Sequence, residues 1–301
     1  MDLQPLVSIL INNYNYAHFV AEAIESALAQ TYRHIEIIVV DDGSTDDSRE
    51  VIGRFGDLVR MVAKENGGQA SAFNAGFAAS KGEIICFLDS DDLFVGDKVR
   101  LIAEIFEQHP NVGWCFNQLR LFDGVDGGFH SPATGWKSGV LDARHDTVVG
   151  RPPFLATATS GLSFRRDTLA KILPMPEVIR ITSDNYVKFV ALGLKEGWMH
   201  SEELSLQRIH GNNAYTNRTI GKKRIVGQTG LLTGICLHEK FPALQPLGKI
   251  VFCKGLGLLW ATGGIDPDCE QLVESFLGSF ALPARSALRL RAACNSARAM
   301  L

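Results

Sequence analysis

Two groups of acidic residues follow apolar runs in the first third of the chain. Asp89, Asp91 and Asp92 form one group, and Asp41 and Asp42 form the other. Carboxylates this close repel one another, and a divalent cation commonly neutralises such a group. Asp89 and Asp91 alternate along the chain, so in a continuing strand both side chains point the same way and could share one ion. Oxygen ligands, completed by diphosphate oxygens, suit Mn²⁺ or Mg²⁺.

Strand and helix patterns alternate around these groups. The apolar runs typical of buried strands are Leu6–Ile11, Ile35–Val40, Leu58–Val62 and Ile84–Leu88. The helical patterns between them cover His18–Tyr32, Ser48–Phe55 and Gln69–Ser80. This alternation predicts an α/β fold with a parallel sheet and right-handed crossovers. Sheets of this class bind ligands outside the carboxyl ends of their strands, where both acidic groups would lie.

Each acidic group also has a simpler interpretation, as a turn that caps the following helix. Their expected meeting at one sheet edge favours a ligand site.

The segment Asn66–Gln69 adds a pair of glycines before a helix that contains Asn74. Glycines such as Gly68 let the backbone approach a ligand, and the helix start offers N–H groups, so a nucleotide could lie there. An ordinary turn is the alternative.

Further elements follow the second acidic group. We expect a helix, a strand and a long surface excursion at Lys98–His109, Val112–Phe116 and Asp123–Pro153. From Lys222 onward the pattern is helical, and three glycines allow close helix packing, namely Gly227, Gly230 and Gly234. We therefore predict a domain over residues 1–221, with halves at 1–116 and 117–221, and a helical extension over 222–301.

Composition excludes several classes of protein. The formal net charge is −3 and no block of Lys or Arg precedes the last stretch, which argues against a nucleic-acid partner. The cysteines form no CxxC pair, so neither a zinc knuckle nor a dense disulfide framework is expected. Met1–Pro5 lacks the features of a signal peptide, and no window of about 18 apolar residues is uninterrupted. We expect a cytoplasmic protein.

The last stretch of the sequence is basic. Arg285, Arg289, Arg291 and Arg298 alternate with Leu and Ala, and no acidic residue follows Glu274. Such a helix could make a peripheral contact with an anionic membrane surface. A solvated basic helix or a frayed tail is the alternative.

Four segments, taken in order, resemble a known family. They are VSILINNYN at Val7–Asn15, IVVDDGSTD at Ile38–Asp46, NGGQASAFNAG at Asn66–Gly76 and GEIICFLDSDD at Gly82–Asp92. Together they look like the nucleotide-sugar half of the family 2 glycosyltransferases, inverting enzymes with the GT-A fold. The match is strong over Leu6–Phe116 and weaker onward to Asn217. It implies a GT-A type, single Rossmann-like, mostly parallel sheet flanked by helices, with a UDP-sugar as the expected donor.

The resemblance also implies residue roles. The nucleotide contacts would be Asn13, Tyr14, Asp41, Asp42, Gly68, Asn74, Asp89 and Arg208. The metal ligands would be Asp91 and His210, the latter within Gln207–Asn213, which is similar to the family's RxH segment. Ser160 and Gly161, in Thr159–Arg165, resemble the border of the acceptor site. Asp184 would remove the acceptor proton, although many members have Glu-Asp where this chain has Ser183 before Asp184.

The resemblance also implies the reaction, an in-line displacement that moves a sugar to a hydroxyl group of a saccharide or lipid-linked acceptor, in bacterial surface polysaccharide synthesis. A nucleotide-sugar-binding module without transferase activity is the alternative. A phosphatase with Asp89 as nucleophile is disfavoured, because Asp92 and Leu93 fit that motif poorly. A dinucleotide-binding oxidoreductase is disfavoured because no GxGxxG follows the first strand.

Overall fold

The chain folds into two compact units. The structure, a computed structural model, describes residues 4–123, 129–130, 135–210, 220–265 and 267–300. The first unit consists of Met1–Arg144, Phe154–Arg180 and Leu194–His210. The second unit consists of His145–Pro153, Ile181–Gly193 and Gly211–Leu301. The segments of the two units interleave along the chain, and a single domain boundary between residues 221 and 222 stays a prediction.

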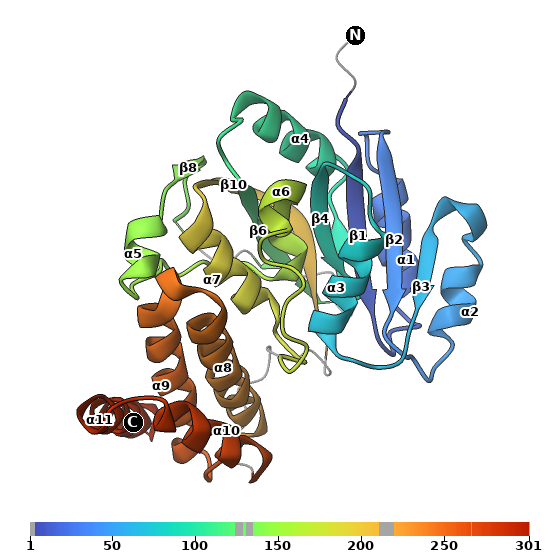
Figure 1. Ribbon diagram of the computed structural model, residues 1–301. Coiled ribbons are helices and arrows are strands. Elements are labelled where there is room, and N and C mark those ends of the chain that lie inside the picture. Colours follow the sequence, from blue (N-terminus) through green and yellow to red (C-terminus); the bar gives the residue numbers. More distant parts are fainter. Residues whose placement is uncertain (1–3, 124–128, 131–134, 211–219, 266, 301) are drawn as a thin grey trace. The chain divides into compact units, whose positions relative to one another are not determined.

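The strands that the structure describes all belong to the first unit and form one sheet (Figure 1). In chain order they are β1 (Val7–Asn13), β2 (Ile35–Asp41), β3 (Arg60–Ala63), β4 (Ile84–Asp89), β5 (Leu93–Phe94), β6 (Trp114–Asp123), β7 (Phe129–His130), β8 (Gly139–Leu141), β9 (Leu162–Arg165) and β10 (Gly197–Ile209). Their order across the sheet is β3-β2-β1-β4-β9-β6-β10-β5, with β7 beside β6 and β8 beside β10. The predicted α/β class is confirmed.

The sheet is parallel in its first half and mixed in its second. Strands β3, β2, β1 and β4 pair in parallel, as the alternation predicts. Strand β9 then runs antiparallel between β4 and β6. Strand β6 is longer than predicted, and β10 was not predicted at all. Register shifts between His200 and Ser205 break the period of two that would reveal β10 in the sequence.

The long excursion predicted at Asp123–Pro153 is more structured than expected, because β7, β8 and a short helix lie within it. Residues 124–128 and 131–134 of that excursion lie outside the described part of the chain, as do Gly211–Asn213 of the segment that resembles the RxH motif.

Helices cover both faces of the parallel half of the sheet. The helices of the first unit are α1 (Val20–Leu28), α2 (Ser48–Gly53), η1 (Gly56–Leu58), α3 (Gln69–Ala79), α4 (Lys98–Gln108), η2 (Thr159–Gly161) and α6 (Arg166–Leu169). Helices α1, α2 and α4 share one apolar core with Ile9 and Val39. Helix α3 covers the opposite face, where an added Cβ at Gly76 would lie 3.2 Å from Cγ2 of Val40.

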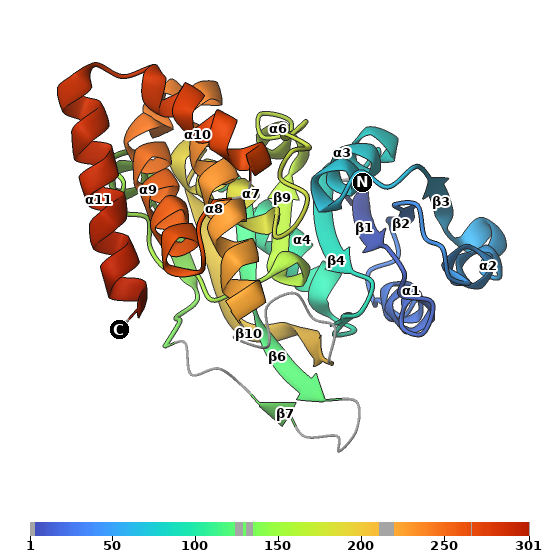
Figure 2. The same ribbon diagram turned by 90° about the horizontal axis from the view of Figure 1, so that it is seen from below.

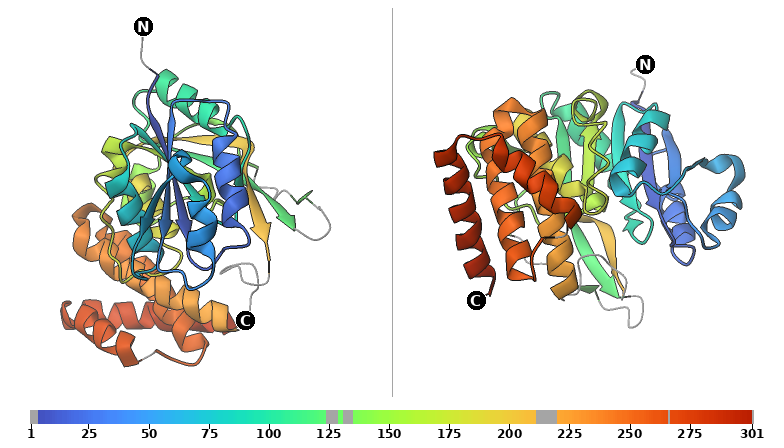
Figure 3. Two further views of the ribbon diagram at one scale, coloured as in Figure 1. Left: turned by 90° about the vertical axis from the view of Figure 1, so that its right-hand side faces the viewer. Right: turned by 60° about the horizontal axis from the view of Figure 1, so that its bottom comes forward.

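The regular elements described in the second unit are all helices. Those that lie wholly or mostly in it are α5 (Arg144–Val148), α7 (Asp184–Leu194), α8 (Ile220–Lys240), η3 (Pro242–Leu244), α9 (Gln245–Ala261), α10 (Pro267–Gly278) and α11 (Leu282–Met300). Helix α9 lies between α8 and α11 (Figures 2 and 3). An added Cβ at Gly234 would lie 2.3 Å from the backbone nitrogen of Phe252, which confirms the close helix packing predicted from the glycines. None of the described helices has the length and apolarity to span a membrane.

Candidate active site

The carboxyl ends of adjacent strands bring the two acidic groups to one edge of the sheet. Asn13 on β1 lies opposite Asp41 on β2, and Asn12 on β1 lies opposite Asp89 on β4. Because the three strands are parallel and in this register, their ends coincide. The convergence inferred from the order of strands and acidic residues is therefore present in the fold.

Three carboxylates gather where β4 ends. One oxygen from each of Asp89, Asp91 and Asp92 lies within 4.8 Å of the others. Nε2 of His210, directly after β10, lies 2.9 Å from Oδ2 of Asp91. The two residues predicted as metal ligands are thus in contact. Carboxylate oxygens with one imidazole nitrogen form a donor set that fits Mn²⁺ or Mg²⁺.

Asp92 is the buried member of this acidic cluster, with 2% of its surface exposed. Its Oδ2 accepts a hydrogen bond from Oγ of Ser160 at 2.6 Å, and its Oδ1 accepts one from the backbone N–H of Arg208 at 3.0 Å. Burial, followed by the charges of Asp91 and Asp89, raises the pKa of Asp92 well above its usual range. Asp92 belongs to the acidic group predicted from the sequence, which assigns it no role of its own.

Ser160 and Gly161 lie beside the acidic cluster, and their role as an acceptor border stays a prediction. Both lie buried in η2. Oγ of Ser160 accepts a hydrogen bond from the backbone N–H of Asp89 at 3.0 Å, in addition to its bond to Asp92. An added Cβ at Gly161 would lie 2.0 Å from Oγ1 of Thr157. Ser160 therefore holds Asp89 and Asp92 in place, while Gly161 allows η2 to approach Thr157 closely.

Arg208 is held beside the acidic cluster. Its Nη2 lies 2.7 Å from a carboxylate oxygen of Glu22, and its Nε donates to the carbonyl oxygen of Asp91 at 3.2 Å. The guanidinium lies over the rings of Phe19 and Phe122, at 4.9 and 4.6 Å from their centroids. These contacts fix a positive charge at the edge of the cluster.

Aromatic rings position His210. Its ring stacks on Phe19 with 5.0 Å between centroids and meets Tyr16 edge-on at 5.5 Å. Burial raises the pKa of Tyr16, and the negative charges of Asp91 and Asp89 raise it further. The hydroxyl of Tyr16 therefore stays protonated at neutral pH and can donate a hydrogen bond.

Asp41 is fully buried at the end of β2. Its carboxylate accepts hydrogen bonds from Nε of Arg49 at 2.7 Å, Nδ2 of Asn13 at 3.1 Å and the backbone N–H of Ser44 at 3.1 Å. Burial alone would raise the pKa of Asp41, but the bonds from Ser44, Arg49 and Asn13 together lower it below its ordinary value. Tyr14, which the resemblance places beside the nucleotide, is 46% exposed.

Asp42 is held by the glycine pair. Its carboxylate accepts hydrogen bonds from Nζ of Lys64 at 2.6 Å and from the backbone N–H groups of Gly67 and Gly68 at 3.0 and 2.6 Å. Gly68 has φ +87°, and an added Cβ there would lie 2.7 Å from the carbonyl oxygen of Arg180. The backbone at Gly68 therefore lies close to the carboxylate of Asp42 and to the backbone of Arg180.

A cavity of about 520 Å³ opens at the ends of β2 and β3. Its lining residues are Gly43, Arg49, Ala63, Lys64, Glu65 and Asn66. Both of its cations are paired, Arg49 with Asp41 and Lys64 with Asp42. The cavity is therefore polar without a large excess of charge, and its size is that of ordinary ligand pockets.

Asn74 has contacts that the predicted nucleotide role does not use. Its Nδ2 donates to the carbonyl oxygen of Met175 at 2.9 Å, and its Oδ1 accepts from the backbone N–H of Met175 at 2.8 Å. This amide anchors a loop to α3.

Gln69, at the start of the same helix, points to the acidic cluster. Its Nε2 lies 3.4 Å from Oδ1 of Asp89 and 3.2 Å from Oγ1 of Thr159.

Asp184, the predicted proton acceptor, belongs to the second unit and begins α7. Its Oδ2 lies 2.9 Å from Nζ of Lys188, one helical turn later, and both side chains are largely buried. Thr182 has φ +54°, a conformation that β-branched residues rarely adopt and that is typical of strained functional turns. The role of Asp184 stays a prediction.

Four polar residues of the site were not predicted from the sequence, namely Tyr16, Arg49, Lys64 and Gln69. The position of Lys64 could have indicated a role in the site. Lys64 directly follows strand β3, just as Asp42 directly follows strand β2. The other three lie in helical or irregular segments, where local patterns do not mark the residues that reach a sheet edge.

Comparisons with known proteins agree with this architecture. Residues 8–169 match the model of Glycosyl transferase family 2. An uncharacterized glycosyltransferase of Nostoc sp. is 38% identical over 212 residues, which cover 69% of this chain and 66% of that protein. Chondroitin synthase of Pasteurella multocida is 45% identical over 119 residues, 38% of this chain and 12% of that protein. S. aureus TarS 1–349, solved in complex with UDP-GlcNAc, has a TM-score of 0.65 at 14% identity and covers 98% of this chain and 89% of that one.

The chain belongs to glycosyl transferase family 2, because the family model matches more than half of its residues. The fold and family define its class as that of the glycosyltransferases, and the predicted GT-A type of fold is confirmed. The chain spans about two thirds of the Nostoc relative and a smaller part of the chondroitin synthase.

Proposed function

We propose that this chain transfers a sugar from a nucleoside diphosphate sugar to a hydroxyl group of a saccharide or lipid-linked acceptor, with inversion at the anomeric carbon. One observation carries the proposal. An acidic cluster suited to a cation and a polar cavity suited to a base lie along the same edge of one sheet, at the ends of β4 and of β2 and β3. A nucleoside diphosphate needs both.

The cavity at the ends of β2 and β3 is the proposed site for the base. Lys64 and Arg49 line it and offer hydrogen-bond donors to the carbonyl oxygens of a base. S. aureus TarS 1–349 was solved in complex with UDP-GlcNAc, and this supports a UDP-sugar as the donor. In this proposal Asp41 and Asp42 serve the base and Asp89 serves the ribose. Asn13 and Gly68 hold Asp41 and Asp42 in place.

Asp91 and His210 are the ligands that we propose for Mn²⁺ or Mg²⁺, with Asp89 beside them. Their contact at 2.9 Å and the third carboxylate within 4.8 Å support this assignment. A bound divalent ion offsets the charge that develops on the departing nucleoside diphosphate. Arg208, fixed by Glu22 and two aromatic rings, adds a second positive charge near the same group.

Asp184 is the proposed general base. The acceptor oxygen attacks the anomeric carbon while the bond from that carbon to the diphosphate breaks, and the hydroxyl proton passes to the carboxylate. The N-terminus of α7 favours a negative side chain at this position, and Lys188 holds it in one orientation. The strained backbone at Thr182 supports a functional turn.

The likeness to a chondroitin synthase supports a saccharide as the acceptor. We place the reaction in the cytoplasm, in the synthesis of a bacterial surface polysaccharide.

Calorimetry with UDP tests the cation site. We expect Mn²⁺ to raise the affinity of the wild type for UDP and to have no such effect on Asp91→Ala. Asp57→Ala, which removes an exposed carboxylate of η1, serves as the control and should behave as the wild type does. A Mn²⁺ effect that persists in Asp91→Ala contradicts the assignment.

Transfer assays test the base. General-base assistance contributes about 10²–10⁴-fold, so Asp184→Asn should lower turnover by that factor while it retains the wild-type affinity for UDP. Equal loss of affinity and turnover contradicts the role. The alternative, a binding module without transferase activity, predicts UDP-sugar binding with neither transfer nor slow donor hydrolysis in the wild type.

A further inference from the structure

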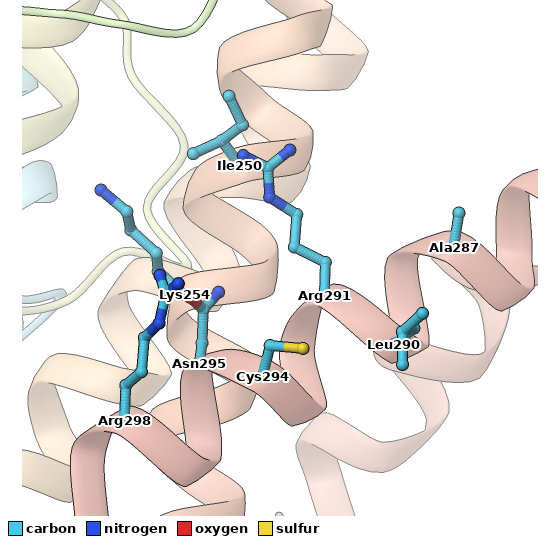
Figure 4. A pocket seen from close by; sticks show the side chains of 8 residues that line it. All are labelled: Ile250, Lys254, Ala287, Leu290, Arg291, Cys294, Asn295 and Arg298. Carbon is cyan, nitrogen blue, oxygen red and sulfur yellow. The ribbon is translucent and has the colours of Figure 1, made fainter. Parts of the chain in front are cut away.

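Helices α9 and α11 of the second unit border a groove of about 430 Å³ (Figure 4). Its lining includes Ile250 and Lys254 from α9 and Leu290, Arg291, Asn295 and Arg298 from α11. The side chain of Arg291 extends toward Ile250, and those of Lys254 and Arg298 extend on the same side of the two helices. We call it the basic groove. It belongs wholly to the second unit and uses no residue of the proposed donor site.

The charge of the basic groove is not neutralised within the described part of the chain. Neither α9 nor α11 contains an acidic residue. Lys254, Arg291 and Arg298 are exposed, and none of the ion pairs among the described residues includes them. Arg289 on the same helix differs, because it pairs with Glu274 of α10 at 2.8 Å.

Apolar surface accompanies these cations. Leu290 is 67% exposed at the groove, and Leu282 is 72% exposed at the start of the same helix. The opposite face of α11 packs on α9, since an added Cβ at Gly257 would lie 2.5 Å from the carbonyl oxygen of Ala292. Two packed helices thus form the groove, and both positive charges and the exposed Leu290 line it.

We propose that the basic groove binds the phosphate headgroups of an anionic lipid bilayer. Lys254, Arg291 and Arg298 contact the phosphates, and Leu290 enters the boundary between headgroups and acyl chains. The exposed leucines favour a bilayer over a soluble polyanion, which would leave them in water. This surface gives the chain a membrane contact that needs neither a spanning helix nor a bound sugar donor.

Sedimentation with lipid vesicles tests the proposal on the full chain. The vesicles contain equal amounts of phosphatidylglycerol and phosphatidylcholine, with pure phosphatidylcholine for comparison. We expect the wild type to bind only the anionic vesicles. The double variant Lys254→Gln with Arg298→Gln should bind about 30-fold more weakly, because each basic residue near such a surface contributes about 1 kcal/mol.

A matched double variant removes the same charge from the same helices outside the groove. Lys249→Gln with Arg289→Gln alters one residue that lies over the ring of Phe280 and one that is paired with Glu274. We expect its binding to fall less than about threefold. Equal losses in the two doubles would mean that binding follows net charge alone, which would overturn the groove as the site.

Two further outcomes also decide the question. A wild type that fails to bind anionic vesicles, or one that binds inorganic pyrophosphate in the groove and no vesicles, overturns the bilayer as the occupant. Circular dichroism melts establish that both doubles are folded, and all variants should keep the wild-type affinity for UDP. Loss of vesicle binding with UDP affinity intact therefore separates this inference from the proposed transfer reaction.

Discussion

The ammonium group of Lys98 lies 2.5 Å from the carbonyl oxygen of Ser160 in the interior of the first unit. Its Nζ also donates to Oγ of Ser205 at 2.9 Å and lies 3.9 Å from the centre of the ring of Phe94. A fully buried ammonium is costly unless it is hydrogen-bonded. These contacts connect α4 to η2, where Ser160 donates a hydrogen bond to Asp92. Lys98 therefore helps to hold the residue that supports the acidic cluster.

The first prediction concerns Lys98 and pH. Burial lowers the pKa of Lys98 from 10.5 to about 8. Between these values the unfolded chain binds more protons than the folded one, so this group makes the fold more stable as pH rises. The free energy of unfolding of the wild type, minus that of Lys98→Met, should grow by about 1.4 kcal/mol from pH 7 to pH 9. Urea unfolding at both values measures this difference, and a constant difference contradicts the prediction.

The second prediction concerns the support of Asp92. Ser160→Ala leaves a buried carboxylate without its hydroxyl donor and should cost about 1–3 kcal/mol of unfolding free energy. Ser163→Ala is the control, because Oγ of Ser163 makes only a weak bond to Sγ of Cys86 at 3.4 Å. We expect it to cost less than about 1 kcal/mol. Urea unfolding compares the two, and similar costs would show that the bond to Asp92 has no special weight.

The third prediction concerns Gly68. Gly68→Ala places a Cβ 2.7 Å from a backbone oxygen at a φ of +87°, so both the backbone and the neighbouring loop must shift. Gly56 also has positive φ, at +53°, but an added Cβ there meets nothing within 4 Å. Gly56→Ala should therefore cost about 1 kcal/mol, and Gly68→Ala about 3 kcal/mol. Thermal melts rank the variants, and the reverse ranking would be inconsistent with the structure.

The fourth prediction concerns Arg49 and acid. A carboxyl group whose pKa is lower in the folded chain, such as Asp41, stabilises the fold above the unfolded value of 3.8 and loses that effect as pH falls below it. Arg49→Met removes one of the bonds that lower this pKa. Its loss of stability relative to the wild type should therefore be larger at pH 7 than at pH 3. Arg54→Met, which breaks only an exposed pair with Glu50, should show little dependence on pH.

Local patterns in the sequence determined the parallel half of the fold and the place of its acidic residues. Apolar runs such as Ile84–Leu88 are long enough to be recognised as buried strands, and parallel strands must end at the same edge. Asp41, Asp42, Asp89 and Asp91 therefore could be assigned to one edge without coordinates. The basic character of the last helix was equally visible, because charge is a property of composition.

Only the tertiary structure decided which side chains support the site. Ser160 is predicted to border the acceptor, and the contact that its hydroxyl makes with Asp92 could not be read from the sequence. Asn74 lies in a helix beside the glycine pair, yet its amide is bonded to Met175, about a hundred positions later. Lys98 begins a predicted helix, and only the fold shows that it is fully buried. Such contacts join segments far apart in the chain, and the energies that select them depend on burial and on partners that no local pattern contains.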